Sequence, residues 1–582
     1  MTPSAASPSP VPSAGLFTGP FAEPSAGSLA GPFAGPATDP SIGPVPRLAA
    51  LERLADRQVG LLGLGREGWS SYRFLRQFVP GLRLIAADRR PVEELAQDWQ
   101  QAFENDDQLE YFRLPDQPGP SLDQSGSRSD QPTGHPDRQP PQLEVDLALR
   151  TPGMTPATAR AAVNSQTAIT SNSQLALEIA ANLPDVTSIG VTGTKGKTTT
   201  TAAIHHLLET AGFSSQLGGN IGTPALDVVG QLLSSDTQAK PDHRRHWLVL
   251  ELSSHQLADM TISPDMAVVQ LVSSEHLDYF TDAAVYQASK KTIAQYQKIE
   301  QVIIYNAESA VAAKIAGLSA AGTQLAFASA AAGQAQSSPD YIFSGGERGA
   351  REFSVWRQGG GGTAGAPPRD QTGQQVISVP LDQLRTRGAH HLYNLVPAVI
   401  IADHYQVAAE VIARGVTSFQ PVPHRLELVA SLNGAEYYND SAATTPDAAQ
   451  AAIETFAGRP LILVLGGSSK GANFSQLVLT AAAAQLRAVI LLPPEGEQIW
   501  QQLEPLLANK PQADGGIPPH PVISRQPVME QAFAKIEQYV QPGDVVLLSP
   551  ACASFSQFDS YQQRGDLFRQ EVQKRAGPAP QT

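Results

Sequence analysis

The sequence Ser188-Ile-Gly-Val-Thr-Gly-Thr-Lys-Gly-Lys-Thr-Thr-Thr200 decides how the rest of the chain is interpreted. A short β-branched run ends in a glycine loop at 193–198, and a segment with alanine and leucine follows to about Ala211. A strand, a glycine loop and a helix in this order place backbone N–H groups and a helix N-terminus around a phosphate. Lys197 can then reach the terminal phosphates, and the Thr198 hydroxyl can ligate Mg2+. The stretch therefore predicts an ATP site.

This phosphate loop departs from the strict Walker A pattern at one position. Val191 stands where the first glycine of GxxxxGK[ST] belongs. A glycine loop of this kind can also be a plain tight turn that binds nothing. The ending Gly196-Lys197-Thr198, placed between an expected strand and an expected helix, favours the nucleotide site over that alternative.

The bulk properties limit the class of protein. With 582 residues the chain is long enough for about three domains, each with its own core. The net charge of −14 argues against nucleic acid as the main partner. The single cysteine, Cys552, excludes an intramolecular disulfide framework and is typical of a reducing compartment. No apolar run is long enough to span a membrane, and no basic residue precedes Arg47, so we expect a cytoplasmic protein without membrane insertion.

Changes in composition along the chain predict a tail, three domains and two insertions. Pro, Ala, Gly and Ser dominate residues 1–46, which cannot bury enough apolar surface to offset chain entropy, so we expect a disordered tail. The expected domains span 47–183, 184–421 and 422–582. A Gln-, Asp- and Pro-rich insertion is expected to be disordered at about 104–143, and a Gly- and Ala-rich insertion is expected to be flexible at about 330–372.

Strand and helix patterns alternate in all three domains and predict an α/β fold. The N-terminal domain is expected to be Rossmann-like, the central one an ATPase-type domain built on the phosphate loop, and the C-terminal one a second Rossmann-like unit. The strands expected in the C-terminal domain are 435–438, 461–465, 488–492 and 545–548. The helices expected there are 447–456, 476–485 and 529–539.

A second glycine-rich turn lies in the N-terminal domain. Gly63, Gly65 and Gly68 form GxGxxG after an expected strand, and Asp88 ends the next strand 20 residues past Gly68. This is the usual geometry of a dinucleotide-binding fold, and taken alone it indicates an NAD-dependent dehydrogenase. The same turn serves any ligand that carries a diphosphate, and it can also be a structural turn in a βαβ unit.

Three further side chains in the central domain are candidates for metal chemistry. Glu251 ends an expected buried strand, where phosphate-loop enzymes usually place the carboxylate partner of Mg2+. His276 follows another apolar strand and can be a metal ligand or an ordinary loop histidine. Lys290 shares a helix face with Tyr286 four residues earlier, and by itself it would be interpreted as a solvated lysine.

Several separate stretches together resemble the Mur ligases of peptidoglycan synthesis. In chain order they are GTKGKTTT, GNIGTP, ELSSHQL, EHLDYF followed by YQASK, PHRLE, NDS, LGGSSKG, and SPACASF followed by RGDLF. They cover nearly all of 57–570 apart from the insertions, and the SPACASF segment points to the glutamate-adding member of the family. The resemblance implies an ATP-dependent ligase that adds D-glutamate to UDP-N-acetylmuramoyl-L-alanine through an acyl phosphate.

The resemblance also implies a role for each domain and for individual residues. The N-terminal domain would hold the UDP part of the substrate, so no NAD is needed. Residues expected at this UDP-linked substrate are Gly65, Ser70, Asp88, Arg89 and Asn220. Residues expected at the incoming glutamate are Thr444, Lys470, Ser554, Phe555 and Tyr561.

The remaining roles concern ATP and two Mg2+ ions. Residues expected at ATP are Gly193, Thr194, Lys195, Gly196, Lys197, Thr198, Thr199, Asn394, Arg425 and Asp440. Thr198 and Glu251 would ligate one ion, and His276 and a carbamoylated Lys290 would ligate the second. The catalytic group is therefore expected to be Lys197, Glu251, His276 and Lys290. A lysine in its usual cationic form could not ligate a metal ion, and carbamoylation turns it into an oxygen donor.

The chain departs from the family pattern at four positions, one in the expected central domain and three in the expected third domain. Ala442 replaces the lysine of the DSKATN pattern, which puts one phosphate contact in doubt. His391 stands where asparagine is usual, which puts an adenine contact in doubt. Ser469 and Asn473 also replace residues that are commonly acidic. These changes do not alter the prediction of a ligase. They concern the choice of the amino acid that the ligase adds.

Four alternatives remain open at this stage. L-glutamate could replace D-glutamate, because no residue pattern separates the two, while a folate ligase would not need residues 57–183. An NAD-dependent oxidoreductase would leave the phosphate loop and the third domain without a role. A catalytically inactive binding protein is suggested by Ala442, but Lys197, Thr198, Glu251 and the two candidate ligands of the second ion are all retained. We expect a monomer, although no sequence feature decides the oligomeric state.

Overall fold

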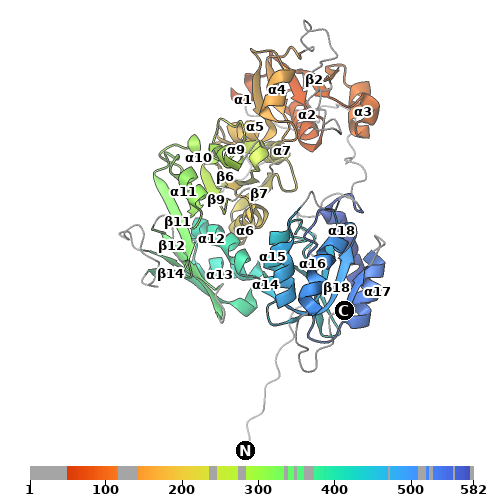
Figure 1. Cartoon of the computed structure of the whole chain (residues 1–582). Helices are drawn as coiled ribbons and strands as arrows, with labels where there is room; N and C mark the ends of the chain where they lie inside the picture. The colour runs from red at the N-terminus through yellow and green to blue at the C-terminus, as the bar shows by residue number, and fades with distance from the viewer. Residues whose placement is uncertain are drawn as a thin grey trace, which may run out of the picture.

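The computed structural model describes residues 49–115, 142–234, 245–272, 283–332, 338–345, 350–358, 373–386, 388–468, 472–508, 520–523, 529–554 and 557–576. The expected tail at 1–46 lies outside these residues, as do the candidate site residues His276, Lys470 and Phe555. Three separate sheets organise the chain, one in each third of the sequence (Figure 1).

The N-terminal sheet has five parallel strands in the order β3-β2-β1-β4-β5. Its strands are β1 (Gln58–Leu62), β2 (Arg83–Asp88), β3 (Leu109–Arg113), β4 (Leu147–Arg150) and β5 (Ala168–Ser171). Its helices are α1 (Ala49–Glu52), α2 (Arg66–Phe78), α3 (Gln97–Asn105), α4 (Pro156–Ala162) and α5 (Asn172–Ala180), with a 3-10 turn at Val92–Glu94. The predicted start of the disordered insertion, at about residue 104, is therefore too early, because β3 pairs with β2 and buries Leu109.

The central sheet has nine strands in the order β14-β13-β12-β11-β10-β9-β6-β8-β7. Its strands are β6 (Val186–Thr192), β7 (Ser214–Gly219), β8 (His246–Glu251), β9 (Met266–Val269), β10 (Val302–Asn306), β11 (Thr323–Ser329), β12 (Tyr341–Ser344), β13 (Glu352–Arg357) and β14 (Gln374–Pro380). Its helices are α6 (Lys197–Thr210), α7 (Ala225–Ser234), α8 (Ser254–Leu257), α9 (Ala283–Ser289), α10 (Thr292–Gln295), α11 (Ala310–Ala316), α12 (Ala389–His404) and α13 (Ala409–Ser418), with a 3-10 turn at Leu381–Gln383.

The expected flexible insertion at 330–372 contains two of these strands. β12 pairs with β11, and β13 pairs antiparallel with β12 and β14, so this part of the range extends the central sheet. Phe343, Phe353 and Val355 are buried in the core beneath it, which explains why the segment is ordered despite its glycine-rich neighbourhood.

The C-terminal sheet has six strands in the order β15-β16-β20-β17-β18-β19, of which only β15 is antiparallel to its neighbour. Its strands are β15 (Glu427–Leu432), β16 (Ala435–Asn439), β17 (Pro460–Gly466), β18 (Gln485–Leu492), β19 (His520–Ile523) and β20 (Val545–Leu548). Its helices are α14 (Pro446–Thr455), α15 (Ser475–Ala483), α16 (Gly496–Ala508), α17 (Met529–Tyr539) and α18 (Tyr561–Ala576). The four expected strands are present, and β15 and β19 are additional.

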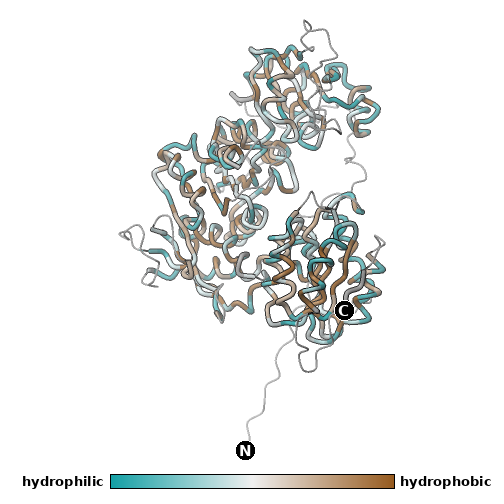
Figure 2. The backbone as a smooth tube through the Cα atoms, in the orientation of Figure 1, coloured by the Kyte–Doolittle hydropathy of each residue, from teal (hydrophilic) through white to brown (hydrophobic). Residues whose placement is uncertain are grey.

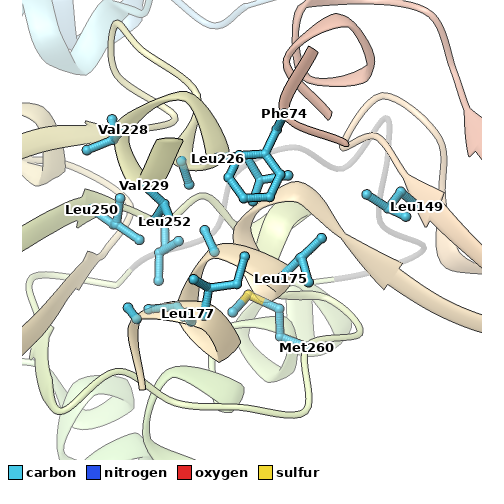
Figure 3. Packing of buried hydrophobic residues seen from close by; sticks show 14 of the residues in the cluster. Phe74, Leu149, Leu175, Leu177, Leu226, Val228, Val229, Leu250, Leu252 and Met260 are labelled. Carbon is cyan, nitrogen blue, oxygen red and sulfur yellow. The ribbon is translucent and has the colours of Figure 1, made fainter. Parts of the chain in front are cut away.

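One hydrophobic cluster joins the N-terminal sheet to the central one. Phe74 and Leu175 from the first unit meet Leu226 and Leu252 from the second in a single buried core (Figure 3). A large apolar interface of this kind opposes relative motion of two units. The two hydrophobic clusters of the C-terminal sheet are separate from this core and contain only residues from Leu426 onward.

The hydrophobic stretches lie within the units, while many of the outlying loops and helix faces are hydrophilic (Figure 2). This pattern fits sheets that are covered by helices, because strands buried on both faces read as continuous apolar runs. Within the described part of the chain, no helix combines the length and apolar character needed to cross a membrane.

Candidate active site

The phosphate loop connects β6 to α6 in the way the sequence predicts. Gly196 caps α6 with φ of +83°, a left-handed conformation that favours glycine. A Cβ at this position would lie 2.2 Å from the Asn394 side-chain oxygen, so α12 packs directly against the loop. Lys197 Nζ donates to the carbonyl oxygens of Gly193 at 3.0 Å and Thr194 at 2.9 Å. The loop is therefore closed around its own lysine.

The candidate site lies along one edge of the central sheet, at the carboxyl ends of five neighbouring strands. Strands β10, β9, β6, β8 and β7 are adjacent and parallel, so their carboxyl ends meet at one edge. Along this edge lie in turn Glu308, Gln270, the phosphate loop, Glu251 and Asn220. Two strand spacings separate β10 from β6, a distance of about 10 Å. A nucleotide with its phosphates on the loop can therefore direct its base toward β10 and its terminal phosphate toward β8.

The Glu251 carboxylate fits a metal ion. Glu251 is 2% exposed, its Oε1 accepts a hydrogen bond from Asn220 Nδ2 at 2.8 Å, and its Oε2 is buried without a hydrogen-bond partner. A buried carboxylate oxygen that lacks a donor carries a free-energy cost that a cation removes. Thr198 lies in the first turn of α6, which follows the neighbouring strand β6. Its hydroxyl group offers a further oxygen ligand for the ion. Among the described side chains no three His, Cys, Asp or Glu groups surround a common point, and the candidate His276 lies outside that set.

Lys290 is not the solvated lysine that its sequence context suggests. It is 1% exposed, and its Nζ donates to the Gly193 carbonyl at 3.0 Å. The same Nζ lies 4.8 Å from the centre of the Tyr286 ring, and the Tyr286 hydroxyl is 3.1 Å from that of Thr194. Tyr286 and Lys290 therefore both contact the phosphate loop, and the role of Lys290 as a metal ligand stays a prediction.

A cavity of about 600 Å³ lies between the phosphate loop and the C-terminal sheet. Its lining includes six residues of the loop, residues at the ends of β9 and β10, the start of α12, and the segment from Arg425 to α14. The expected ATP residues that line it are Thr194, Lys195, Gly196, Lys197, Thr198, Thr199, Asn394, Arg425 and Asp440. Lys195 Nζ also lies 3.7 Å from Asp447 Oδ2 of α14, across this cavity. A nucleotide-sized space is thus shared by two units of the chain.

Asp440 is a buried acidic group on the C-terminal side of this cavity. Its oxygens accept hydrogen bonds from the Ser549 hydroxyl at 2.8 Å and from the Leu426 backbone N–H at 3.2 Å. Burial nevertheless raises the pKa of Asp440 to about 7. Two of the four departures from the family pattern, Ala442 and His391, line the same cavity, as does Thr444, which was expected at the glutamate.

Sequence reasoning missed the residues at the far end of the cavity. Asn306 ends β10 and Glu308 follows it, and Glu308 accepts hydrogen bonds from the Tyr393 hydroxyl at 3.2 Å and the Ser329 backbone N–H at 2.7 Å. Gln270 bridges α6 and α12, because its amide donates to the Thr200 hydroxyl at 2.8 Å and to the Tyr393 carbonyl at 3.1 Å. The available signal was positional, since each group lies at or just after the carboxyl end of a buried parallel strand.

The N-terminal glycine turn has the geometry of a diphosphate site. A Cβ at Gly68 would lie 2.3 Å from the Gly63 carbonyl oxygen, so glycine is required there for the helix to approach the strand. A Cβ at Gly65 would meet nothing within 4 Å, which leaves open space at the start of α2. Ser70, also expected at the substrate, is buried and bonded to the Asn172 amide at 3.2 Å.

Asp88 is bound to this turn and pairs with a basic residue that the sequence reasoning did not single out. Asp88 Oδ2 accepts a hydrogen bond from the Leu64 backbone N–H at 2.9 Å. Its ion pair, at 2.9 Å, is with Arg90, and both Arg90 and the neighbouring Arg89 are exposed. Hydrogen bonds from Arg90 and Leu64 outweigh partial burial and hold the pKa of Asp88 below its usual value. Residue spacing could not show which of two adjacent arginines turns back to the carboxylate.

The C-terminal loops meet around one buried arginine. Arg564 is fully buried, and it donates to the Ser441 hydroxyl at 2.9 Å, the Ser441 carbonyl at 2.9 Å and the Cys552 carbonyl at 3.0 Å. The Ser441 hydroxyl donates to the Tyr561 carbonyl at 2.7 Å. Arg564 thus holds the loop after Asp440 against the loop that contains Cys552, and Ser441 links it to Tyr561, one of the residues expected at the glutamate substrate.

Family models match the two parts of the chain that carry these features. The Mur ligase middle domain matches residues 191–360, and the Mur ligase, glutamate ligase domain matches residues 424–552. A UDP-N-acetylmuramoylalanine–D-glutamate ligase of Salinibacter ruber is 33% identical over 411 residues, which are 68% of this chain and 78% of the relative. The chain belongs to the Mur ligase family.

Other relatives of this Mur ligase cover more of its length. A ligase of Geobacillus kaustophilus with the same name is 29% identical over 527 residues, which are 89% of this chain and 98% of the relative. Among solved structures, the UDP-N-acetylmuramate-alanine ligase of Thermotoga maritima superposes with a TM-score of 0.49 at 14% identity, over 90% of this chain and all of that one. The prediction of an ATP-dependent amide ligase with a mixed α/β fold is confirmed, and the oxidoreductase alternative is wrong.

Proposed function

We propose that this Mur ligase joins D-glutamate to UDP-N-acetylmuramoyl-L-alanine in peptidoglycan precursor synthesis, with conversion of ATP to ADP and phosphate. The observation that carries the proposal is the order of groups along the central sheet edge. Asn220 and Glu251 lie on the side of the N-terminal glycine turn, and the phosphate loop lies between them and the nucleotide cavity. Relatives that bear the D-glutamate ligase name over most of the chain support the choice of substrates.

The proposal divides the work among three domains at 47–183, 184–421 and 422–582. The first would be a Rossmann-like holder of the UDP group, which its parallel strand order β3-β2-β1-β4-β5 supports. The central domain would bind ATP. The third would be Rossmann-like as well and would present the amino acid near Thr444, Ser554 and Tyr561.

The first chemical step activates a carboxylate, which is a poor acylating agent. The alanyl carboxylate of the UDP-linked substrate attacks the γ-phosphorus of ATP, a P–O bond forms, and ADP leaves with the electron pair of the broken P–O bond. Both reactants are anionic, so the site must offset their repulsion. Lys197 is placed to do so, because its ammonium group lies at the mouth of the phosphate loop.

The second step forms the amide. The amine of glutamate attacks the acyl phosphate carbon, loses a proton, and the tetrahedral intermediate expels inorganic phosphate. The cavity joins the phosphate loop to the C-terminal loops, which supports a division in which the central unit holds the acyl phosphate and the C-terminal unit presents the amine. We propose that the C-terminal unit closes on the other two around the segment near Pro423 for this step.

Two Mg2+ ions would supply Lewis-acid stabilisation of the developing phosphate charge. Thr198 and Glu251 would hold the first, for which the unpartnered Glu251 oxygen is a fitting ligand. Lys290, as its carbamate, and His276 would hold the second. The burial of Lys290 against the phosphate loop supports that role, because a carbamate there would add oxygen ligands beside the γ-phosphate.

The remaining parts of the proposal follow from the substrates. ATP and a UDP-linked precursor are cytoplasmic metabolites, so we propose a cytoplasmic enzyme, and we keep the monomer as a separate proposal. The experiment that tests the proposal is mass spectrometry of the nucleotide product. Incubation with ATP, Mg2+, UDP-N-acetylmuramoyl-L-alanine and D-glutamate should add one glutamyl residue to the nucleotide, and an unchanged nucleotide would refute the proposal.

A further inference from the structure

Two consecutive residues of the N-terminal glycine turn reach across to the expected metal site. Arg66 donates to the Asn220 carbonyl oxygen at 3.4 Å, and the Asn220 amide donates to Glu251 Oε1 at 2.8 Å. The next residue, Glu67, accepts a hydrogen bond from Gln256 Nε2 at 2.8 Å. The turn that would cradle the diphosphate therefore contacts both loops that flank Glu251.

Glu67 is an unusual group for this position. It is 8% exposed, its Oε1 has the Gln256 amide as a partner, and its Oε2 is buried without any partner. Burial raises the pKa of Glu67 to about 7. A buried carboxyl group with one unpartnered oxygen costs free energy, so packing alone does not account for an acid here.

Gln256 relays this contact to the strand that carries Glu251. Its side-chain carbonyl accepts from the Ser253 backbone N–H at 2.9 Å and from the Ser253 hydroxyl at 3.0 Å, in a capping box that starts α8. Because the carbonyl end is occupied by Ser253, the amino end must face Glu67. Ser253 is only two residues after Glu251, so the relay fixes the backbone that directs the Glu251 side chain.

We propose that Glu67 is a positioning residue for the metal-ligand carboxylate of Glu251, a role that rests on the proposed ligase function. Through Gln256 and Ser253, Glu67 ties the diphosphate turn to the end of β8. Through the hydrogen bonds of Arg66 to Asn220 and of Asn220 to Glu251, the same turn is also linked to Glu251 Oε1. Contacts within the protein thus fix the position of the UDP-linked substrate relative to the metal site before ATP and the amino acid bind.

A swap of two side chains tests the relay. Gln256→Glu places two buried carboxyl groups opposite each other, and we expect Mn2+ binding in the presence of a non-hydrolysable ATP analogue to weaken at least tenfold. The double variant Glu67→Gln with Gln256→Glu restores a donor–acceptor pair, because the amide introduced on α2 can donate to the carboxylate introduced on α8. Its Mn2+ affinity should return to within threefold of the wild-type value. Electron paramagnetic resonance of Mn2+ measures this without turnover.

Gln77→Ala is the matched control. Gln77 lies on the same helix, α2, and its amide donates to the Ser234 hydroxyl of the central unit at 2.9 Å, at the opposite end of the helix from Glu67. Loss of that contact should leave Mn2+ affinity within twofold of wild type. Thermal unfolding of all variants separates loss of folding from loss of the relay.

The positioning role is overturned if Gln256→Glu binds Mn2+ as tightly as wild type. It is equally overturned if the double variant stays as weak as Gln256→Glu while unfolding at the wild-type temperature. If the proposed ligase function is wrong, the wild-type protein will make no product. The Mn2+ titration is independent of that outcome and would still test the positioning role of Glu67.

Discussion

Lys197 Nζ and Lys290 Nζ donate to the same atom, the Gly193 carbonyl oxygen, each at 3.0 Å. The two nitrogens are therefore no more than about 6 Å apart, a separation at which two ammonium groups, one buried and one half-buried, repel each other appreciably. Lys290 is 1% exposed, so water screens little of this repulsion. Converting the Lys290 amine to a carbamate replaces repulsion by attraction at the phosphate loop.

The first prediction concerns this modification. The protein incubated with 13C-labelled bicarbonate should show a carbamate carbon signal in its NMR spectrum, and Lys290→Arg should lack it. Ligase activity of the wild type should fall in CO2-free buffer and recover when bicarbonate is added. A carbamate signal that persists in Lys290→Arg, or activity indifferent to bicarbonate, would contradict the assignment.

The second prediction concerns the catalytic groups of the central unit. Glu251→Gln keeps an acceptor for the Asn220 amide but removes the charge of the proposed metal ligand. We expect kcat to fall about 100- to 1,000-fold, the effect typical of losing one electrostatic contact to a transition state. Lys197→Ala should remove ADP formation. Turnover at the wild-type rate in either variant, measured as ADP released, would refute the proposed mechanism.

The third prediction uses two glycines with the same backbone angle. Gly196 and Gly212 both have φ of +83°, but a Cβ at Gly196 would strike the Asn394 side chain, whereas one at Gly212 would meet nothing within 4 Å. Gly212→Ala should cost only backbone strain of about 1–2 kcal/mol and leave ATP binding intact. Gly196→Ala should incur the same strain and also lose ATP affinity, because the phosphate loop must move. Calorimetric titration of ATP into both variants gives the comparison, and equal affinities would show that the close approach is unimportant.

The fourth prediction follows from the raised pKa of Asp440. Its pKa is about 7 in the folded protein and 3.8 in a solvated chain, so the folded state binds more protons between these values. Stability contributed by this group is therefore present below about pH 4 and is lost as the pH rises toward 7, by up to about 1.4 kcal/mol per pH unit. Asp440→Asn should flatten this decline in the free energy of unfolding from pH 5 to 8.

Asp440 should also give ATP binding a pH dependence. A carboxylate accepts hydrogen bonds from ribose hydroxyls better than a carboxylic acid does. The KM for ATP should therefore fall as the pH rises from 6 to 8 in the wild type and stay nearly constant in Asp440→Asn. The same slope in both proteins would place the titrating group elsewhere.

The fifth prediction concerns closure. The N-terminal and central sheets share one hydrophobic core, while the cores of the C-terminal sheet are separate. We expect the first two units to move as one body and the third to rotate against them. Small-angle X-ray scattering should show a smaller radius of gyration when Mg2+, an ATP analogue and the UDP-linked substrate are present. A cross-linked variant held in its open form that still makes product would contradict closure.

Much of the site could be predicted from sequence because local patterns fix it. The phosphate loop, the strand ending in Glu251 and the glycine turn at Gly63 each follow directly from a strand–turn–helix signature. The burial of Lys290 could not be predicted in this way, since its helix position alone is typical of a solvated side chain. Only its resemblance to a family motif indicated a role in the site.

Long-range contacts account for what the sequence could not show. The pairing of Asp88 with Arg90 depends on the path of the chain after β2, and the Glu67–Gln256 contact joins residues 189 positions apart. Strands β12 and β13 were missed because the glycine- and serine-rich residues around them mask short buried runs such as 353–356. Packing against α12 and β14 orders these runs, and single-sequence patterns do not report such packing.

The most direct test of the central claim is phosphate release by the purified protein with ATP, Mg2+ and UDP-N-acetylmuramoyl-L-alanine. D-glutamate, L-glutamate or no amino acid would be added in turn. The account predicts sustained release only when D-glutamate and the nucleotide substrate are both present. Release with L-glutamate alone would keep the chemistry but contradict the proposed product, and no release under any condition would contradict the account itself.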